Sequence, residues 1–218
     1  MLRWAIARAE WERLLLMAAL ALILYALFLF LAFGVRTFMQ IRATGSSGFH
    51  GISGSPGSVE WIAGVLFVVA LVLGVAAPIL ALTDLVEPIA SIDGDAINLI
   101  GLLLAVAGVN LTVYSQTSMG SSWRVGVDEG EQTALVTSGA FAFVRNPIFS
   151  AMIPTALGLA MMVPSVVSIA ALGALIVALE LQVRIVEEPY LIRVHGDDYR
   201  SYAASTGRFI PGVGRLAF

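Results

Sequence analysis

The sequence contains apolar blocks that are long enough to cross a lipid bilayer. Residues 14–35 and 61–82 each run for 22 residues without a charged side chain, and residues 96–114 form a third long block. A helix of 22 residues rises about 33 Å, which is more than the ~30 Å thickness of the hydrocarbon core. Backbone polar groups in lipid must be paired within the segment itself. The blocks therefore predict transmembrane α-helices.

The composition agrees with a membrane protein and excludes several kinds of site. The chain is 59% hydrophobic and 12% charged, whereas soluble domains carry about 25% charged residues. It has no cysteine and only two histidines, His50 and His195, which excludes disulfides, thiolate nucleophiles and cysteine-based metal centres. The net charge of −3 also argues against a nucleic-acid-binding surface. We expect no metal site and no nucleic-acid partner, with the lipid bilayer as the principal environment.

Two shorter apolar blocks follow in the second half of the chain. Residues 147–163 and 165–179 are joined at residues 162–164 and predict a helical hairpin. The expected fold is an all-α integral membrane protein with about five transmembrane helices, the last two forming this hairpin. We divide the chain into an N-terminal membrane region of three spans, residues 1–115, and a C-terminal region, residues 116–218. The C-terminal region contains a polar loop, the hairpin and a tail that is expected to bind a cofactor.

Two polar segments flank the first block. Residues 1–13 carry Trp4 and Trp11 among charged residues, which is typical of a short interfacial segment. The apolar block behind them is longer than the 7–15 residues of a signal peptide core, so we expect a retained helix. Residues 42–58 are rich in glycine and serine and predict a flexible loop.

The arginines predict the orientation of the chain. With five spans, three arginines (Arg3, Arg8 and Arg13) lie on one side of the membrane and nine on the other. Basic residues concentrate on the cytoplasmic side, so the N-terminus is expected outside and the C-terminus inside a bacterial plasma membrane. The nine arginines on the expected cytoplasmic side are Arg36, Arg42, Arg124, Arg145, Arg184, Arg193, Arg200, Arg208 and Arg215.

Polar residues at the third block allow two interpretations each. Asp93 and Asp95 flank Gly94 and could suggest calcium, but no twelve-residue ligand loop follows, and we expect Asp95 to cap the next helix. Asn98 and Asn110 interrupt the block itself. Their amides either form hydrogen bonds between helices or line a pocket.

Charged residues also recur where the last apolar block ends. Glu180, Arg184, Glu187 and Leu191 have the spacing i, i+4, i+7 and i+11, which predicts one face of a helix. Arg184 also precedes Glu188 by four residues. These residues form either solvent-exposed ion pairs on a helix that leaves the bilayer, or a functional cluster.

The second half of the chain carries several motifs in a definite order. Residues 135–149 read LVTSGAFAFVRNPIF and precede the apolar hairpin. After the hairpin come Glu187-Glu188, Leu191, His195-Gly196-Asp197-Asp198-Tyr199, Tyr202 and Arg208-Phe209-Ile210-Pro211. In this order and spacing, residues 120–215 resemble the isoprenylcysteine carboxyl methyltransferases and the related membrane phospholipid methyltransferases.

The sequence departs from that family pattern at four positions. Asn146 stands where the family has a histidine, so a role that requires an imidazolium is not available there. Phe141 and Phe149 replace tyrosines, and His195 replaces a phenylalanine. We expect His195 to form local hydrogen bonds rather than to act in catalysis.

The resemblance implies S-adenosylmethionine as the cofactor, and the sequence has no G-x-G-x-x-G fingerprint of a Rossmann domain. It implies that Glu187 binds the ribose or the ammonium group and that Arg145 binds the cofactor's carboxylate, while Arg184 is a candidate for holding the acceptor's anion. The residues expected to act in catalysis are Arg145, Glu188 and Arg184. The residues expected to bind the cofactor are Thr133, Ala134, Leu135, Val136, Phe141, Asn146, Pro147, Ile148, Phe149, Glu187 and Tyr199.

The resemblance thus implies a membrane methyltransferase with a lipidic or hydrophobic acceptor, either a lipidated small molecule or a lipidated peptide. The reaction is O-methylation of a carboxylate, as on isoprenylcysteine, or N-methylation of a phospholipid-like amine. One alternative is an NADPH-dependent reductase related to sterol reductases, which have a similar C-terminal pattern. Another is a non-enzymatic transport subunit, but its polar residues would be expected along a pore rather than at one membrane face.

Overall fold

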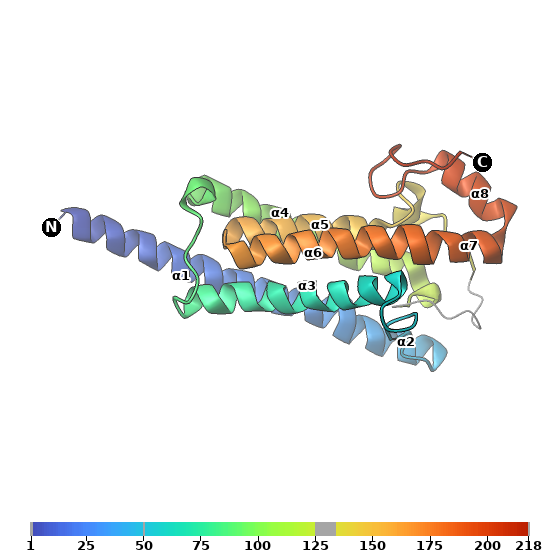
Figure 1. Ribbon diagram of the computed structural model, residues 1–218, viewed down its shortest axis with the longest axis horizontal. Helices are drawn as coiled ribbons and strands as arrows, with labels where there is room; N and C mark the ends of the chain where they lie inside the picture. The colour runs from blue at the N-terminus through green and yellow to red at the C-terminus, as the bar shows by residue number, and fades with distance from the viewer. Residues whose placement is uncertain (1, 50, 125–133, 218) are drawn as a thin grey trace.

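The computed structural model describes residues 2–49, 51–124 and 134–217 as a bundle of long helices (Figure 1). Three short 3-10 turns, η2 (Ala90–Ile92), η3 (Gly120–Ser122) and η4 (Gly139–Ala142), lie in the connections. Two π-helical segments, η1 (Phe30–Val35) and η5 (Gln182–Glu187), continue longer helices without a break. The α-helices are α1 (Leu2–Leu29), α2 (Arg36–Thr44), α3 (Val59–Leu82), α4 (Asp95–Met119), α5 (Pro147–Met162), α6 (Val166–Leu181), α7 (Glu188–His195) and α8 (Asp197–Ser205).

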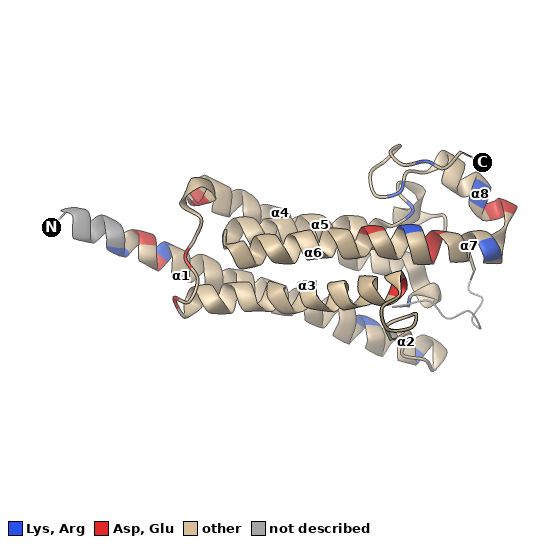
Figure 2. Ribbon diagram, in the orientation of Figure 1, with Lys and Arg blue, Asp and Glu red and all other residues tan. Residues whose placement is uncertain are grey.

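The predicted fold class is confirmed. Four continuous helices are long and apolar enough to cross a membrane, namely Arg8–Thr44, Val59–Leu82, Asp95–Ser122 and Val166–His195, and the shorter apolar helix Pro147–Met162 makes a fifth. The helices alternate in direction, so the N-terminus and the α5–α6 turn lie at one end of the bundle and the C-terminus at the other (Figure 1). Among the residues that the structure describes, the charged ones occupy the two ends of the bundle and none lies in its middle (Figure 2).

The N-terminal helix differs from the prediction. Residues 1–13 were expected as a separate interfacial segment, but the described part of it, residues 2–13, forms the first turns of α1. The sequence contains no glycine or proline there that could end a helix. Arg8 and Glu12 instead form an exposed i,i+4 ion pair of 2.9 Å along α1, and this part of the helix extends beyond the rest of the bundle (Figure 1).

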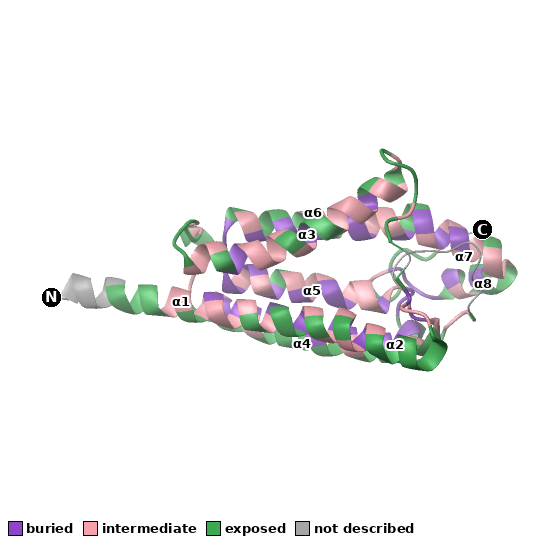
Figure 3. Ribbon diagram, turned by 90° about the horizontal axis from the view of Figure 1, so that it is seen from below, coloured by how far each residue is buried: buried purple, intermediate pink, exposed green. Residues whose placement is uncertain are grey.

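Small residues allow α4 and α5 to pack closely. Gly101, Ala105 and Gly108 lie on α4 and meet Thr155 and Gly158 on α5. A Cβ atom on Gly101 would come within 2.6 Å of the Gly158 carbonyl oxygen. Close backbone approach at small residues is a common way for helices to associate in membranes, where the hydrophobic effect between helices is absent. On the outer faces of the long helices, apolar side chains remain exposed (Figure 3).

A polar layer joins the helices at the N-terminal end of the bundle. The Arg13 guanidinium donates hydrogen bonds of 3.0 and 2.6 Å to the two carboxylate oxygens of Asp93. These hydrogen bonds hold the pKa of Asp93 below its usual value. Asn98 accepts a hydrogen bond from Arg13 and donates one of 2.9 Å to the carbonyl oxygen of Met161. The layer therefore connects α1, the α3–α4 connection, α4 and the end of α5.

These contacts decide between the interpretations of the nearby polar residues. Asn98 forms hydrogen bonds between helices. For Asn110 neither interpretation holds, because its amide donates to the carbonyl oxygen of Val106 in its own helix and it does not line a cavity described here. The expected capping role of Asp95 is wrong by one position, because Gly94 is the N-cap of α4 and no side chain caps it. Asp95 is the first residue of the helix and pairs with Arg13 at 3.2 Å.

We expect Gly158→Ala to lower the thermal unfolding midpoint of the protein in detergent micelles. The new methyl group would collide with the Gly101 carbonyl oxygen and the Ala105 backbone, and overpacking typically costs about 1–3 kcal/mol. Gly173→Ala is the matched control, because Gly173 also lies within a helix but has no atom within 4 Å of an added Cβ. Equal midpoints for the two variants would contradict the close packing of α4 on α5.

Candidate functional site

A cavity of about 580 Å³ lies between the helices at the C-terminal end of the bundle. Small-molecule and cofactor sites usually measure about 300–1,000 Å³, so this cavity can hold one cofactor-sized molecule. Its walls come from α1 and η1, α3, α4, α5, and the continuous helix formed by α6, η5 and α7. Every long helix of the bundle therefore contributes to it.

The cavity has an apolar part and a polar part. Phe33, Phe67, Met152 and Leu179 lie on the side toward the bundle centre. The polar side chains lie on the turns nearer the C-terminal end of the bundle. The larger ones are Glu60, Gln116, Arg124, Arg145, Asn146, Gln182 and Glu187, and the hydroxyl residues Ser53 and Thr112 also line the cavity. The arrangement suits a ligand, or a pair of ligands, with one polar and one apolar portion.

The glycine-rich segment forms part of the cavity wall. Four residues of this segment line the cavity: Phe49, Gly51, Ile52 and Ser53. The Phe49 and Trp123 rings pack edge to face, with their centroids 6.1 Å apart. Every third residue from 45 to 57 is a glycine with a positive φ angle. Residues that carry a Cβ atom rarely adopt this backbone conformation. The predicted loop at residues 42–58 thus begins after Thr44, where α2 ends, and turns repeatedly at its glycines beside the cavity.

Both π-helical segments border the cavity. Ala32 and Phe33 belong to η1, and Gln182 and Glu187 belong to η5. A π-helical turn contains one more residue than an α-helical turn, which rotates the following side chains around the helix. Such segments occur frequently at functional sites.

This rotation overturns one prediction. Glu180, Arg184, Glu187 and Leu191 were expected on one helix face, but only Glu187 and Leu191 line the cavity. Arg184 is exposed and pairs with Glu180. The i+4 pair between Arg184 and Glu188 is absent, because η5 breaks the α-helical spacing on which both expectations depended.

Glu188 instead joins two buried arginines in a cluster, Arg145–Glu188–Arg208. The Arg145 Nη2 atom lies 2.6 Å from Glu188 Oε1, and the Arg208 Nη2 atom lies 2.7 Å from Glu188 Oε2. Arg208 Nε donates a further hydrogen bond of 2.9 Å to Oε1. All three residues are at most 9% exposed. A buried carboxylate is tolerated when its charge is paired and its oxygens accept hydrogen bonds, and both conditions hold here.

Backbone carbonyl groups complete the cluster. Arg145 Nη1 donates to the carbonyl oxygens of Ala203, at 3.0 Å, and of Thr206, both at the C-terminal end of α8. This end of a helix carries partial negative charge, which favours a cation. Arg145 Nη2 also donates to the Gly214 carbonyl oxygen at 3.0 Å. One arginine side chain thus holds the tail of the chain against the start of α5.

The backbone makes the same connection. Arg145 N donates to the Gly207 carbonyl oxygen at 2.8 Å, and Asn146 N donates to the Arg208 carbonyl oxygen at 3.1 Å. The Asn146 side-chain amide also donates to the Arg208 carbonyl oxygen at 3.2 Å. Two motifs about 60 residues apart in the sequence, Arg145-Asn146-Pro147 and the segment at Arg208, therefore lie side by side.

Two guanidinium nitrogens of cavity-lining residues have no hydrogen-bond partner. Arg124 Nη1 and Arg145 Nε are buried and have no hydrogen-bond partner. The Arg124 guanidinium lies over the Tyr190 ring, 5.2 Å from its centroid, and its charge faces Glu187, which also forms a hydrogen bond with Gln182. Buried unpaired donors are uncommon in proteins, so these two atoms mark places where an anionic ligand group would be stabilised.

The structure brings seven of the residues expected to form the site together at the cavity: Phe141, Arg145, Asn146, Pro147, Ile148, Phe149 and Glu187. Ala134, Leu135 and Val136 lie outside it, in the segment before η4, where the Ser122 hydroxyl donates to the Ala134 carbonyl oxygen at 3.5 Å. Thr133 lies outside the described residues. Glu188 is behind Arg145, and Arg184 is on the outer surface.

Tyr199 was expected at the cofactor but is buried behind Arg145, away from the cavity. Its ring packs against the Tyr202 ring, with the two ring centroids 6.2 Å apart. The Tyr202 hydroxyl donates a 2.6 Å hydrogen bond to the Phe141 carbonyl oxygen. Burial raises the pKa of Tyr202 to about 12 and also raises the pKa of Tyr199. Both phenols therefore stay protonated near neutral pH and support the cavity wall from behind. His195, the last residue of α7, also lies outside the cavity wall.

Sequence reasoning missed most of the wall that comes from the first half of the chain. Glu60, on the first turn of α3, and Gln116, near the end of α4, face the same cavity as Glu187. Arg124 and Gln182 were not singled out as site residues either. Glu60 and Gln116 are isolated polar residues near the ends of apolar blocks, and nothing in the sequence indicates that these ends meet.

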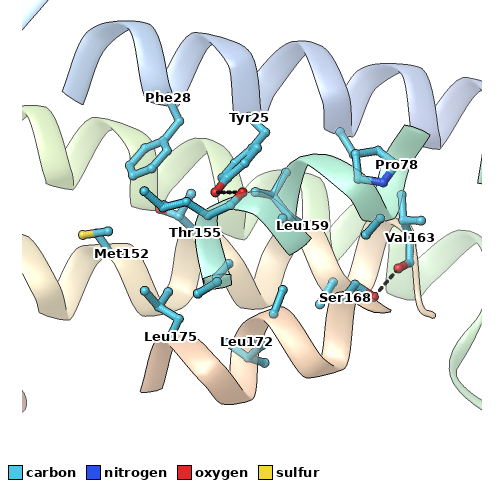
Figure 4. Close-up of a pocket in the computed structure, with 18 residues that line it drawn as sticks. Tyr25, Phe28, Pro78, Met152, Thr155, Leu159, Val163, Ser168, Leu172 and Leu175 are labelled. Atoms are coloured by element: carbon cyan, nitrogen blue, oxygen red, sulfur yellow. Dashed lines mark hydrogen bonds between the residues drawn. The ribbon is translucent and has the colours of Figure 1, made fainter. Parts of the chain in front are cut away.

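A second, much smaller cavity lies in the centre of the bundle (Figure 4). Its volume is about 40 Å³, and apolar side chains line most of it together with the hydroxyls of Tyr25, Thr155 and Ser168. The Tyr25 hydroxyl donates to the Leu71 carbonyl oxygen at 3.2 Å, and Ser168 donates to the Val163 carbonyl oxygen at 2.6 Å. This volume suits a water molecule or two and excludes a cofactor.

A comparison with known families matches part of the chain. A family model described as phospholipid methyltransferase matches residues 97–198, from the first turn of α4 to the first turn of α8. Comparison with curated proteins gives no match. The family match confirms the resemblance seen in the C-terminal motifs and supports a membrane methyltransferase in general. Such enzymes generally use S-adenosylmethionine. The matched region contains most of the polar cavity wall but neither α3 nor Arg208.

We expect Glu188→Gln to lower the thermal unfolding midpoint of the protein strongly. The substitution leaves two buried guanidiniums without an anion, and breaking a buried pair in this way typically costs about 3–5 kcal/mol. Glu180→Gln is the matched control, because it removes an exposed ion pair that is worth about 0–1 kcal/mol. A Glu188→Gln variant as stable as the control would show that the Arg145–Glu188–Arg208 cluster does not hold the tail in place.

Proposed function

We propose that the protein is an S-adenosylmethionine-dependent methyltransferase that acts within the membrane on a hydrophobic or lipid-bearing acceptor. The observation that carries the proposal is the convergence of the Arg145–Phe149 motif and Glu187 on one wall of a 580 Å³ cavity. The family match over residues 97–198 supports the same activity.

The unpaired groups at the cavity fit the charged portions of S-adenosylmethionine. Arg124 Nη1 and Arg145 Nε, both buried without a partner, are suited to its carboxylate. Glu187 is an acidic group of the same polar wall, as is Glu60, and Glu187 is suited to its ammonium group or its ribose hydroxyls. Phe141 and Trp123 supply flat apolar surface for adenine.

S-adenosylmethionine, when bound, supplies a methyl group on a positively charged sulfur atom, which a nucleophile displaces in line. The chain's own contribution is to align the two reactants and to exclude water from them, and alignment can supply several kcal/mol. A carboxylate acceptor is ionised at neutral pH and needs no general base, whereas an amine must first lose a proton. The apolar part of the cavity, around Phe33 and Phe67, would hold the acceptor's apolar chain.

The residues that stand outside the cavity receive other roles in this proposal. Glu188 and Tyr199 position Arg145 and the Phe141 segment from behind, so they are positioning residues rather than catalytic ones. Arg184, exposed and paired with Glu180, can contact an acceptor only at the outer surface of the bundle.

The alternatives have less support. A sterol-type reductase that uses NADPH shares the C-terminal pattern, but the family match is to methyltransferases. In a transport subunit, polar residues would be expected along the bundle, yet within the described residues the middle of the bundle is uncharged (Figure 2). We also propose that the C-terminal end faces the cytoplasm, because Arg36, Arg184 and Arg208 all lie toward this end of the bundle and basic residues favour that side.

We expect Glu187→Gln to weaken the binding of S-adenosylmethionine while the protein stays folded. Loss of one charge-assisted contact typically costs about 1.5–3 kcal/mol, which corresponds to a roughly 10–150-fold lower affinity. The measurement is isothermal titration calorimetry on the purified protein in detergent micelles.

Glu180→Gln is again the control, since Glu180 lies two residues before η5 on the same continuous helix but does not line the cavity. It should bind S-adenosylmethionine with native affinity. If Glu187→Gln also binds with native affinity and has a native unfolding midpoint, Glu187 does not contact the cofactor, and the proposed site is wrong.

A further inference from the structure

The large and the small cavity lie end to end and share two residues. Leu71 on α3 and Met152 on α5 line both of them. Figure 4 shows Met152, Phe28 and Leu175 at one end of the small cavity and Val163 at the other. One layer of side chains therefore separates the cavities. We call this layer, formed by Phe28, Leu71, Met152 and Leu175, the floor of the large cavity.

The floor is closed by apolar packing. Phe28, Met152 and Leu175 are each at most 5% exposed, and Leu71 packs against the same core cluster. Methionine is unbranched and flexible, so it fills irregular gaps in a core. Replacing such a side chain by alanine removes several heavy atoms and leaves a space behind. Truncation of Met152 or Leu71 would therefore connect the two cavities.

The small cavity beyond the floor offers apolar surface. Ala70, Gly74 and Ala77 line it on α3, and Ala156 and Ala160 line it on α5. Its three hydroxyl groups already donate hydrogen bonds to backbone carbonyl oxygens. Small side chains leave a narrow gap between the helices, which suits the methylene groups of an alkyl chain.

The deep end of the large cavity is also closed at its side. The Phe33 ring packs edge to face on the Phe28 ring and on the Phe67 ring, with centroid distances of 6.3 and 6.5 Å. These rings bridge η1 and α3. One level deeper, the Tyr25 ring fills the space beside Gly74, where an added Cβ would come within 2.8 Å of it. A chain that extends from the polar wall toward the bundle centre therefore meets the floor.

The distance from the polar wall to the floor limits the length of such a chain. Between Asn146 and Met152, α5 rises about 9 Å, and between Glu60 and Leu71, α3 rises about 16 Å. An extended covalent chain advances about 1.2 Å per bond. The space above the floor therefore accommodates a chain of about 8–13 bonds.

We propose that the floor sets the length of the acceptor's apolar chain. The acceptor places its polar head at the wall of Arg124 and Glu187 and extends a chain of about 8–13 carbon atoms to the floor. Met152 and Leu71 exclude longer chains, because the small cavity beyond them is closed in the native protein. This inference rests on the proposed function, since it assigns the apolar part of the cavity to the acceptor.

Floor variants test the proposal with probes of defined length. The probes are tritiated n-alkanoic acids and n-alkylamines of about 8 to 18 carbon atoms, a series that brackets the proposed limit. Their dissociation constants are measured by scintillation proximity on the purified protein in detergent micelles. The readout is the ratio of the native constant to the variant constant for each probe, in which partitioning of the probe into the micelle cancels.

For Met152→Ala the ratio should stay near one for the shortest probes and rise to at least ten-fold for the longest. Each methylene group that gains an apolar site is worth about four-fold in affinity, and the opened cavity admits two or three of them. Met161→Ala is the matched control, because Met161 lies on the same helix and lines neither cavity. It should give a ratio near one at every length.

A second substitution identifies the route of the chain. Ala156 lines the small cavity one turn beyond Met152, so Ala156→Val added to Met152→Ala should return the ratio for long probes to near one. Leu71→Ala opens the same floor from α3. It replaces Met152→Ala if the unfolding midpoint shows that the latter does not fold.

Ratios near one at every length for both floor variants would overturn the proposal. The chain would then leave sideways past Val68, which lines the cavity and is 47% exposed. A native protein that binds none of the probes would also overturn it. Calorimetric titration of the native protein with S-adenosylhomocysteine separates this failure from that of the proposed function. Binding of S-adenosylhomocysteine with a flat length profile rejects only the floor, whereas a length profile that responds to Met152→Ala without such binding keeps the floor and rejects the methyltransferase.

Discussion

The site depends on the burial of one carboxylate between two guanidiniums. Glu188 pairs with Arg145 and Arg208 at 2.6 and 2.7 Å, and the carbonyl groups at the end of α8 accept hydrogen bonds from Arg145 Nη1. Separately, each of these charges would be too costly to bury, whereas together they are paired and hydrogen-bonded. The cluster joins the start of α5, the start of α7 and the tail, so it fixes the backbone from which Arg145 and Asn146 reach the cavity.

The helices supply the rest of the cavity through their irregularities. The π-helical segments η1 and η5 turn Phe33 and Glu187 into the cavity, and the glycines between residues 45 and 57 bend the connecting segment against it. Regular packing continues elsewhere, where Gly101 and Gly158 bring α4 and α5 into backbone contact. The bundle is therefore tight toward its N-terminal end and open toward its C-terminal end. This is consistent with a polar cofactor entering from the aqueous side and an apolar acceptor chain extending toward the bundle centre.

Much of the fold could be predicted because its signals are local. Apolar blocks of fixed length indicated the spans and the hairpin, and the sequence around Arg145 indicated one wall of the cavity. The prediction that Arg184 and Glu187 share one helix face was wrong, because η5 adds one residue to the helical turn. No local signal in the sequence indicates this extra residue. The pairing of Glu188 with Arg208, 20 residues away, and the position of Glu60 opposite the C-terminal wall depend on tertiary packing. Asn98 shows the same limit, since the sequence could not tell an interhelical hydrogen bond from a pocket-lining amide.

The central claim is that the cavity at the C-terminal end binds a sulfonium methyl donor. It is tested most directly by calorimetric titration of the purified protein with S-adenosylhomocysteine, the demethylated product of that donor, and separately with NADPH. Saturable binding of S-adenosylhomocysteine, with no heat of binding from NADPH, is the predicted result. Binding of NADPH without binding of S-adenosylhomocysteine would contradict the claim and would favour the reductase alternative.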